Sequence, residues 1–515
     1  MSAFPKSLSP WRALALGTAL AFSGGCEPEP ARESSPPTDT TPTEAAEPAL
    51  HPERRGIGAL TLPPRGPSAL AISVDPRSSL TVTDTTILTN FTFQRVMNQL
   101  VAQSGVAGLT SLRLFQEWWD TANPAPGLGL GGPHCNDSIF AGQPALNTFP
   151  YLCPRQEGVQ ATTNPFISPG TNADEYVPAA LVNRFDLAPA SGSDCGEYRI
   201  VFVKRSGMTN PGNRNLIIFE AVLPNPNPAL GLNGCRPVTD LWAKLTSLPN
   251  PTDRANLLND FYFNGLPGFM PVVHIDNYGN RTGSVATGQV RSNQFMQGPW
   301  TLREFKLRLQ ICSSTTPCAL RFIPVTVKTN PGGTLFSPAS THPQAPAFQG
   351  PAFPAEVPTL AVNDINLFNL NVANVFNSGQ SNAQGPENDY LAAFGPGPSP
   401  FHTNIQTQLT AAGSTLTPQN IVARAEALSC AGCHQLSNGA NLGGGIVWPP
   451  SAGFVHVTEQ LEPGPFGTRF RISPALTTTF LPHRKAVLET FLNSSCGDAT
   501  CQPWETHAAC SADCP

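Results

Sequence analysis

Charged residues are scarce in this chain of 515 residues. Asp, Glu, Lys and Arg together make up 13 % of the sequence, about half the share usual in globular proteins. The formal net charge is −5, and no long basic run occurs. Proteins that bind nucleic acids usually gather Lys and Arg on one surface. The composition therefore argues against nucleic acid as the main partner.

Common catalytic motifs are also missing. The sequence contains no glycine-rich phosphate loop, no Gly-x-Ser-x-Gly nucleophile elbow and no His-Glu-x-x-His zinc helix. We therefore expect residues 59–400 to form a body that binds or packs rather than one that catalyses. Within it, Arg184 and Asp186 stand two residues apart, and we expect such a pair to orient a loop.

Long apolar runs are absent after the N-terminus. No later run approaches about 18 uninterrupted apolar residues, the length that spans a bilayer as a helix. Near the N-terminus, Lys6 and Arg12 form a basic start before a short apolar stretch over 13–25. That stretch is too short for a permanent spanning helix, and it predicts a secretory signal.

The small residues at 23–25 and the Cys26 that follows them resemble the bacterial lipoprotein signal. In that family the cysteine becomes the first mature residue and carries a lipid. The resemblance implies a signal peptide over 1–25, lipidation of Cys26 and anchoring to a membrane. Because Glu27 rather than Asp follows the cysteine, an outer-membrane or cell-surface lipoprotein is expected, on the periplasmic or extracellular face. The alternative is a plain secretory signal cleaved elsewhere.

Residues 26–58 are rich in Pro, Glu, Ser and Thr and have almost no aromatic side chains. Such a segment cannot bury enough apolar surface to offset its chain entropy. We therefore expect a disordered tether between the lipid and the folded part.

The count of cysteines fits an oxidising compartment. Of 13 cysteines, Cys26 is assigned to the lipid, and Cys430 and Cys433 belong to a motif described below. Ten remain, six in the body and four in the tail, and even numbers favour disulfides. Connectivity cannot be deduced from sequence, so neighbours in the chain are the first assignment. The disulfide candidates are Cys135, Cys153, Cys195, Cys235, Cys312, Cys318, Cys496, Cys501, Cys510 and Cys514.

The body reads as β-rich with a few helices. Residues 305–311 alternate apolar and polar side chains, and 320–327 form a second apolar run. These two runs predict a hairpin closed by a Cys312–Cys318 disulfide. Further strands are expected at 198–203 and 216–222, and helices at 93–103, 111–119 and 239–246, the last with Thr239 as its cap.

The strongest chemical signal is Cys430-Ala431-Gly432-Cys433-His434, because Cys-x-x-Cys-His is the attachment signature of a c-type haem. Two thiols one helical turn apart can each form a thioether with a vinyl group of the porphyrin. The adjacent histidine then supplies a nitrogen to the iron. The motif predicts haem c held covalently by Cys430 and Cys433, with His434 as the proximal ligand. The alternatives are a Cys430–Cys433 disulfide or half of a zinc site.

The surroundings of the motif suit an apolar macrocycle. A helix over 418–428, capped by Thr417, leads into Cys430, and no charged residue occurs over 427–458. Another helix is expected over 482–493. Helix, attachment motif, loops and closing helix resemble a small class I cytochrome c domain. The resemblance implies an all-α cytochrome c-like domain over 401–493. The residues expected beside the ring are Gly443, Gly444, Gly445, Val447, Trp448 and Phe454.

The sixth iron ligand departs from that family, which usually uses a methionine after the motif. None of the five methionines follows Met296. His483 is the possible distal ligand with the better spacing, and His456 is the second candidate. Otherwise the position is open or filled by a methionine of the body. Two histidine ligands favour low-potential electron transfer, whereas an open position allows peroxide or small-ligand chemistry.

The tail over 494–515 holds four cysteines in 22 residues and is too short for a core of its own. It resembles short Cys-rich modules at the ends of bacterial surface proteins. We expect a disulfide-stabilised tag.

Taken together, the sequence predicts a multidomain protein, with a β-rich, disulfide-stapled α+β body followed by a small all-α cytochrome c-like domain. The expected protein is an envelope-anchored monohaem lipoprotein for one-electron transfer or redox sensing, with an unknown redox partner. Two other classes stay open. One is a haem enzyme of the peroxidase or oxygenase type with an open sixth position, and the other is a haem-free surface adhesin or scaffold.

Overall fold

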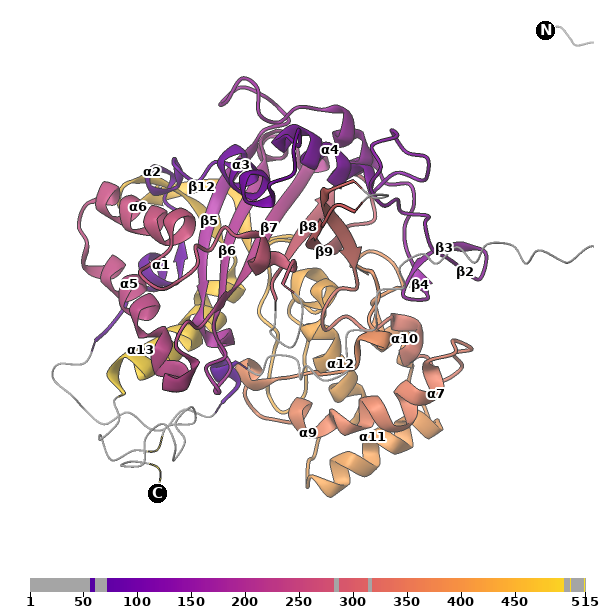
Figure 1. Cartoon of the computed structure of the whole chain (residues 1–515). Coiled ribbons are helices and arrows are strands. Elements are labelled where there is room, and N and C mark those ends of the chain that lie inside the picture. The colour runs from indigo at the N-terminus through magenta and orange to yellow at the C-terminus, as the bar shows by residue number, and fades with distance from the viewer. Residues whose placement is uncertain are drawn as a thin grey trace, which may run out of the picture. The chain divides into compact units, whose positions relative to one another are not determined.

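An antiparallel sheet forms the centre of the fold, and its longer strands lie side by side in Figure 1. The strand order is β1-β5-β6-β7-β8-β9-β10, and the short β11 pairs with β9. The computed structural model describes residues 56–60, 72–281, 287–313 and 317–494, together with Cys501 and Cys514. All of these residues belong to one unit of the chain, Pro48–Pro515.

The described part of the chain is a mixed α+β fold. The strands of the main sheet are β1 Thr81–Val82, β5 Tyr176–Arg184, β6 Asp194–Lys204, β7 Arg214–Pro224, β8 Gln289–Phe295, β9 Thr301–Gln310, β10 Ala319–Val325 and β11 Gln380–Asn382. The strands of the two small sheets are β2 Ile139–Phe140, β3 Gln143–Leu146, β4 Phe149–Pro150, β12 Val457–Gly464 and β13 Gly467–Ile472. The α-helices are α1 Pro76–Ser79, α2 Thr85–Leu88, α3 Phe93–Ser104, α4 Ser111–Asp120, α5 Arg236–Ser247, α6 Pro251–Asn259, α7 Ala345–Ala347, α8 Phe353–Ala355, α9 Val357–Leu360, α10 Tyr390–Phe394, α11 Pro400–Ala411, α12 Pro418–Leu428 and α13 Leu481–Asn493. Among these helices, none combines the length and the apolar character needed to span a bilayer.

One face of the main sheet is apolar and is covered by α3 and α4. The Phe93 ring of α3 lies 5.3 Å from that of Phe202 on β6. Trp118 of α4 stacks on Phe322 of β10 at 4.2 Å and meets Phe305 of β9 at 5.5 Å. Because side chains alternate between the two faces of a strand, one face brings together Phe202, Phe219, Val290, Phe305 and Phe322 from neighbouring strands in this core. The opposite face carries charged side chains.

The C-terminal third of the chain contributes to two cores. Helices α7 and α9 to α12 gather at the lower right of Figure 1 around a second apolar core. Helix α13 instead packs with the sheet, where Phe491 lies 4.7 Å from Phe185. The hairpin β12–β13 reaches the sheet edge, because Phe470 N donates to Thr83 O at 3.0 Å. This hairpin was not expected from the sequence, and contacts cross the boundary expected at residue 400.

Two local expectations are wrong. Helix α5 begins at Arg236, so Thr239 lies inside the helix and its hydroxyl donates to Arg236 O. The proline after Arg236 suits the first turn of a helix and sets the earlier start. The expected tether over 26–58 ends sooner, because Ile57 is fully buried and its N–H donates to Ala188 O at 2.8 Å. Cys26, the signal peptide and the rest of the tether lie outside the described residues.

Disulfides fasten the body at three places. The bonded pairs are Cys135–Cys153, Cys195–Cys235 and Cys312–Cys318. The last closes the β9–β10 hairpin. In the tail, Cys501 pairs with Cys514, so neighbouring cysteines do not pair there. Cys496 and Cys510 lie outside the described residues.

Removal of the Cys195–Cys235 disulfide is expected to lower the free energy of unfolding by about 4 kcal/mol, because the bond closes a loop of 40 residues in the unfolded chain. The Cys312–Cys318 bond closes a loop of only 6 residues, and its removal should cost about 2 kcal/mol. Chemical denaturation of the two double-alanine variants checks this order. Equal losses would show that native-state contacts, not loop entropy, set the cost.

Candidate functional site

The Cys430–His434 motif follows directly after helix α12 and lies in the interior. Thr417 caps the start of the helix in a reciprocal capping box with Asn420. The helix ends at Leu428, and the Ser429 side chain accepts the N–H of Gly432 at 3.0 Å, which starts a short second helical segment. A Cβ at position 432 would stand 1.7 Å from Glu426 O, so the motif can pass this close to α12 only with glycine there.

Both thiols of the motif are unpaired and only partly exposed. They face two different apolar clusters. Cys430 packs against the Trp300 cluster, whose other members are Leu302, Val327, Ala383, Ala431, Phe295, Leu436 and Phe454. Cys433 packs against the Trp448 cluster, which also includes Phe368, Ala423, Ala427, Leu442 and Phe480. Burial raises the pKa of Cys430 to about 11 and that of Cys433 to about 12, so both are neutral thiols at pH 7.

His434 is held in one orientation. Its Nδ1 lies 2.8 Å from Phe454 O, and this contact assigns the proton to Nδ1 and leaves Nε2 with its lone pair. The Nδ2 group of Asn293 donates to the same carbonyl at 2.9 Å, and Trp300 Nε1 donates to Asn293 Oδ1 at 2.7 Å. The Trp300 ring also stacks on the His434 ring at 5.4 Å. Burial lowers the pKa of His434 to about 4, so the ring is neutral and able to bind a metal at pH 7.

The structure brings His456 beside the motif. Its Nε2 lies 3.3 Å from Cys433 Sγ, its Nδ1 lies 2.8 Å from Ser473 Oγ, and its ring centre is 4.8 Å from that of His434. Two imidazoles on opposite sides of one metal, with bonds of about 2 Å, have ring centres about 6 Å apart. In the structure described, the ring centres of His434 and His456 are therefore about 1 Å closer together than that separation.

His483 has its hydrogen-bond partner away from the motif. Its Nε2 lies 2.6 Å from Gly58 O, at the N-terminal end of the described chain. Among the described residues, His483 makes no hydrogen bond or ring contact with the motif. Among the methionines of the body, Met208 packs against the sheet core, and Met296 Sδ lies 3.9 Å from Asn215 Nδ2.

The residues expected beside a ring divide into two groups. Trp448 and Phe454 belong to the clusters that contact the thiols, whereas the Val447 side chain is 59 % exposed. Gly443 has a positive φ, and a Cβ there would stand 2.5 Å from the Asn420 side chain. Its close approach is therefore to α12.

Arg424, like Asn293 and Trp300, is a site residue that the sequence did not indicate. It is fully buried in α12, and its guanidinium donates to four backbone carbonyls. Two belong to the loop after the motif, Leu442 and Gly443. The other two are at the C-terminal end of α9, Leu360, and just beyond it, Val362. The guanidinium also lies over the Phe368 ring at 4.7 Å. Arg424 therefore fastens the loop after the motif to α12.

Glu426 lies one helical turn before Cys430, and burial raises the pKa of its carboxyl group from about 4.5 to about 7. The unfolded chain releases this proton near pH 4.5, whereas the folded protein keeps it up to about pH 7. The free energy of unfolding should therefore fall by about 3 kcal/mol from Glu426 as the pH rises through this window.

Replacement of Glu426 by glutamine should remove that part of the pH dependence. Glutamine keeps an acceptor for Leu391 N, which donates to the carboxylate at 3.1 Å. Urea denaturation of both proteins at pH 4.5 and pH 8 measures the change. An identical loss of stability between the two pH values in both proteins would contradict the assignment.

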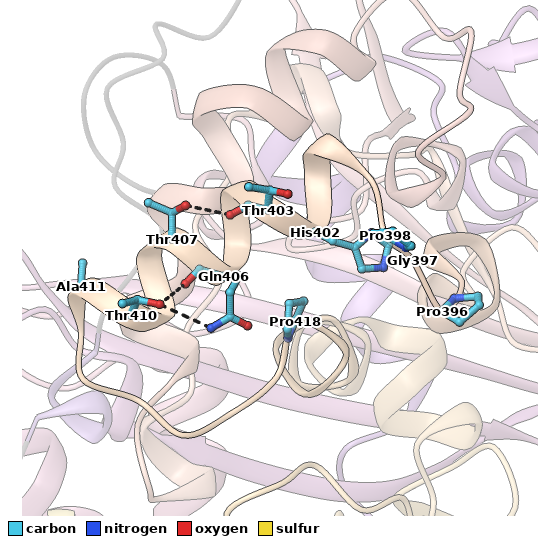
Figure 2. Close-up of a pocket in the computed structure, with 10 residues that line it drawn as sticks. All are labelled: Pro396, Gly397, Pro398, His402, Thr403, Gln406, Thr407, Thr410, Ala411 and Pro418. Carbon is cyan, nitrogen blue, oxygen red and sulfur yellow. Dashed lines mark hydrogen bonds between the residues drawn. The ribbon is translucent and has the colours of Figure 1, made fainter.

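A separate recess of about 810 Å³ lies along α11 (Figure 2). Its polar groups are already engaged. His402 Nδ1 lies 2.7 Å from Ser399 Oγ, and its ring stacks on Phe394 at 3.8 Å. The Thr407 and Thr410 hydroxyls donate to carbonyls of their own helix. We therefore assign no chemistry to this recess.

Among the residues that the structure describes, no three His, Cys, Asp or Glu side chains gather into a metal-binding group. The donor set of the motif does fit haem c, because it offers two unpaired thiols and an oriented neutral imidazole with a free Nε2. No family model, no curated protein and no solved structure matches the chain, so the assignment depends on the chain's own residues.

Proposed function

We propose that the protein binds one haem c covalently through Cys430 and Cys433 and serves one-electron transfer or redox sensing at the cell envelope. The observation that carries the proposal is the 2.8 Å contact between His434 Nδ1 and Phe454 O, which leaves Nε2 free beside two unpaired thiols. Haem iron, when bound, supplies a one-electron couple.

Each residue of the motif then has a defined task. The two cysteines hold the porphyrin edge, and His434 binds the iron through Nε2. The hydrogen bond from Nδ1 to a carbonyl makes a histidine a more basic ligand and fixes its ring plane. Asn293 and Trp300 act as positioning residues, because they hold the Phe454 carbonyl and the His434 ring.

The proposed haem segment resembles class I cytochromes c. Helix α12, the motif and the closing helix α13 follow that pattern in chain order. The hairpin β12–β13 between motif and closing helix departs from an all-α domain. Lipidation at Cys26 would place the protein at the outer membrane or cell surface, with a redox partner still to be found.

A second candidate is small-ligand or peroxide chemistry at an open sixth position. Two contacts favour it. His483 Nε2 lies at hydrogen-bond distance from Gly58 O, and the His456 ring centre is only 4.8 Å from that of His434. Such a site would act on a small molecule that reaches the iron opposite His434.

Spectroscopy of the purified protein tests the proposal and separates the two candidates. The chain from Cys26 onwards is produced in a periplasm that matures a control c-type cytochrome. A reduced pyridine spectrum of the c type supports haem attachment. Carbon monoxide binding to the reduced protein then indicates the open position, and no binding indicates a sixth ligand. A protein without haem, beside a matured control, would leave a haem-free adhesin or scaffold.

A further inference from the structure

Arg303 of β9 is a buried cation that lacks a carboxylate partner. It is 1 % exposed, and its Nη2 donates to Leu152 O and, at 3.1 Å, to Gln380 Oε1. Its Nε and Nη1 are buried, and no group in the described part of the chain accepts a hydrogen bond from them. Among the described residues, no carboxylate oxygen lies within 4 Å of its nitrogens. The guanidinium therefore keeps N–H donors that meet no acceptor.

Arg155 is a second buried arginine close to Arg303, and its charge is balanced. Its Nε and Nη2 bind the two oxygens of Glu157 at 3.1 and 2.8 Å. Its Nη1 donates to Pro299 O at 2.9 Å. Since Glu157 is held on both oxygens by Arg155, it does not serve as the partner of Arg303.

Tyr151 adds a further donor beside Arg303. The guanidinium carbon lies 3.8 Å from the centre of the Tyr151 ring, so the hydroxyl of this ring is close to the guanidinium. The hydroxyl is buried, and none of the described residues bonds to it. Burial raises the pKa of Tyr151, so the hydroxyl keeps the proton that it can donate. Buried O–H and N–H donors without acceptors favour an anion as the ligand.

Glu387 is the other carboxylate near Arg303, and the amide of Gln380 separates the two. Gln380 Oε1 accepts from Arg303, whereas Gln380 Nε2 donates to Glu387 Oε2 at 3.0 Å. Burial raises the pKa of Glu387 to about 7, so its carboxyl group is neutral in about half of the molecules at pH 7. Glu387 therefore balances Arg303 only in part. A buried charge without a counter-charge strongly destabilises a fold.

We propose that Arg303 and Tyr151 bind a small monovalent anion, of the size of chloride, inside the folded chain. A water molecule accepts the same hydrogen bonds but leaves the charge of Arg303 unbalanced. Because the unsatisfied donors are fully buried, the ligand is limited to one or a few atoms and is enclosed when the chain folds. This inference does not depend on haem binding.

The anion would stabilise the strand that also holds the haem-attachment motif. Gln380 of β11 lies opposite Arg303 and contacts it through its amide. The next residue, Ser381, points to the other face of the sheet, where its Oγ accepts the N–H of Ala431 at 2.9 Å. Strand β11 therefore lies between the anion site and the motif.

Bromide is the probe for this site, because it takes the place of chloride and scatters X-rays anomalously. Crystals of the full chain are grown with bromide in place of chloride. We expect an anomalous peak at hydrogen-bond distance from Arg303 and Tyr151 in the wild-type protein and in Arg471→Gln, and no peak there in Arg303→Gln. Arg471 gives the matched control, since it is an exposed arginine (55 %) at the β12–β13 hairpin.

Urea denaturation in solution completes the test. Chloride is varied at constant ionic strength, with gluconate as the balancing anion because it is too large for a buried site. A ligand that binds only the folded chain stabilises it as the ligand concentration rises. We therefore expect the urea midpoint to rise with chloride in the wild-type protein and in Arg471→Gln, and to stay constant in Arg303→Gln.

A wild-type bromide map without an anomalous peak at Arg303 would overturn the inference and assign a water molecule to the unsatisfied donors. A peak without any dependence of the urea midpoint on chloride would be an adventitious ion only, and it would overturn the inference as well. If Arg303→Gln does not fold, the two wild-type measurements decide by themselves.

Discussion

Replacement of Arg424 by leucine is expected to lower the free energy of unfolding by about 3–5 kcal/mol. Leucine has a similar apolar stem but no donors, so the carbonyls of Leu360, Val362, Leu442 and Gly443 would lose their partners. Each buried acceptor left without a hydrogen bond costs about 1–3 kcal/mol, and the lost desolvation cost of the guanidinium offsets part of the sum.

Chemical denaturation of the Arg424→Leu variant measures this loss. Arg471→Leu is the control, because an exposed arginine should change stability by no more than about 0.5 kcal/mol. Since Arg424 fastens the loop after the motif, the variant should also bind less haem per chain. A loss below about 1 kcal/mol would show that water or a shifted loop replaces the guanidinium.

Replacement of both Cys430 and Cys433 by alanine is expected to remove all haem from the denatured chain. Thioether bonds survive denaturation, whereas a haem held only by His434 dissociates when the protein unfolds. A denaturing gel stained for haem peroxidase activity makes the comparison. The control is the double-alanine variant of Cys312 and Cys318, which removes a disulfide in the hairpin loop and should keep its haem band.

A haem band that persists in the Cys430 and Cys433 double variant would place the attachment at another pair of cysteines. Single variants refine the result, since each thiol faces its own apolar cluster. Each should keep one thioether and therefore a weaker band.

The sequence predicted the local elements that carry the motif. The cap at Thr417 and the apolar positions of 418–428 indicated α12, and strict alternation over 305–311 indicated one strand of the β9–β10 hairpin. Both signals are local, because a cap or an alternating strand is set by neighbouring residues. The hairpin β12–β13 was missed, since Pro463 and the glycines at its turn weaken any strand pattern.

The charged face of the sheet could not be predicted from the sequence. Arg199, Glu220, Arg291 and Glu304 occupy alternate positions of their strands, which usually indicates a solvated face. Their pairing depends on strand register between residues up to 71 positions apart, and their cover comes from the C-terminal segment. Arg424 left no signal either, because all of its hydrogen-bond partners are backbone carbonyls.

Peptide mass spectrometry of the denatured protein decides whether haem is attached covalently to Cys430 and Cys433. Protein from a host that matures a control cytochrome is digested. The mass of the fragment that contains Cys430, Cys433 and His434 is then measured. We expect a fragment heavier by one haem, bound through both cysteines. A fragment with the bare mass, or with the two-proton loss of a Cys430–Cys433 disulfide, would contradict it.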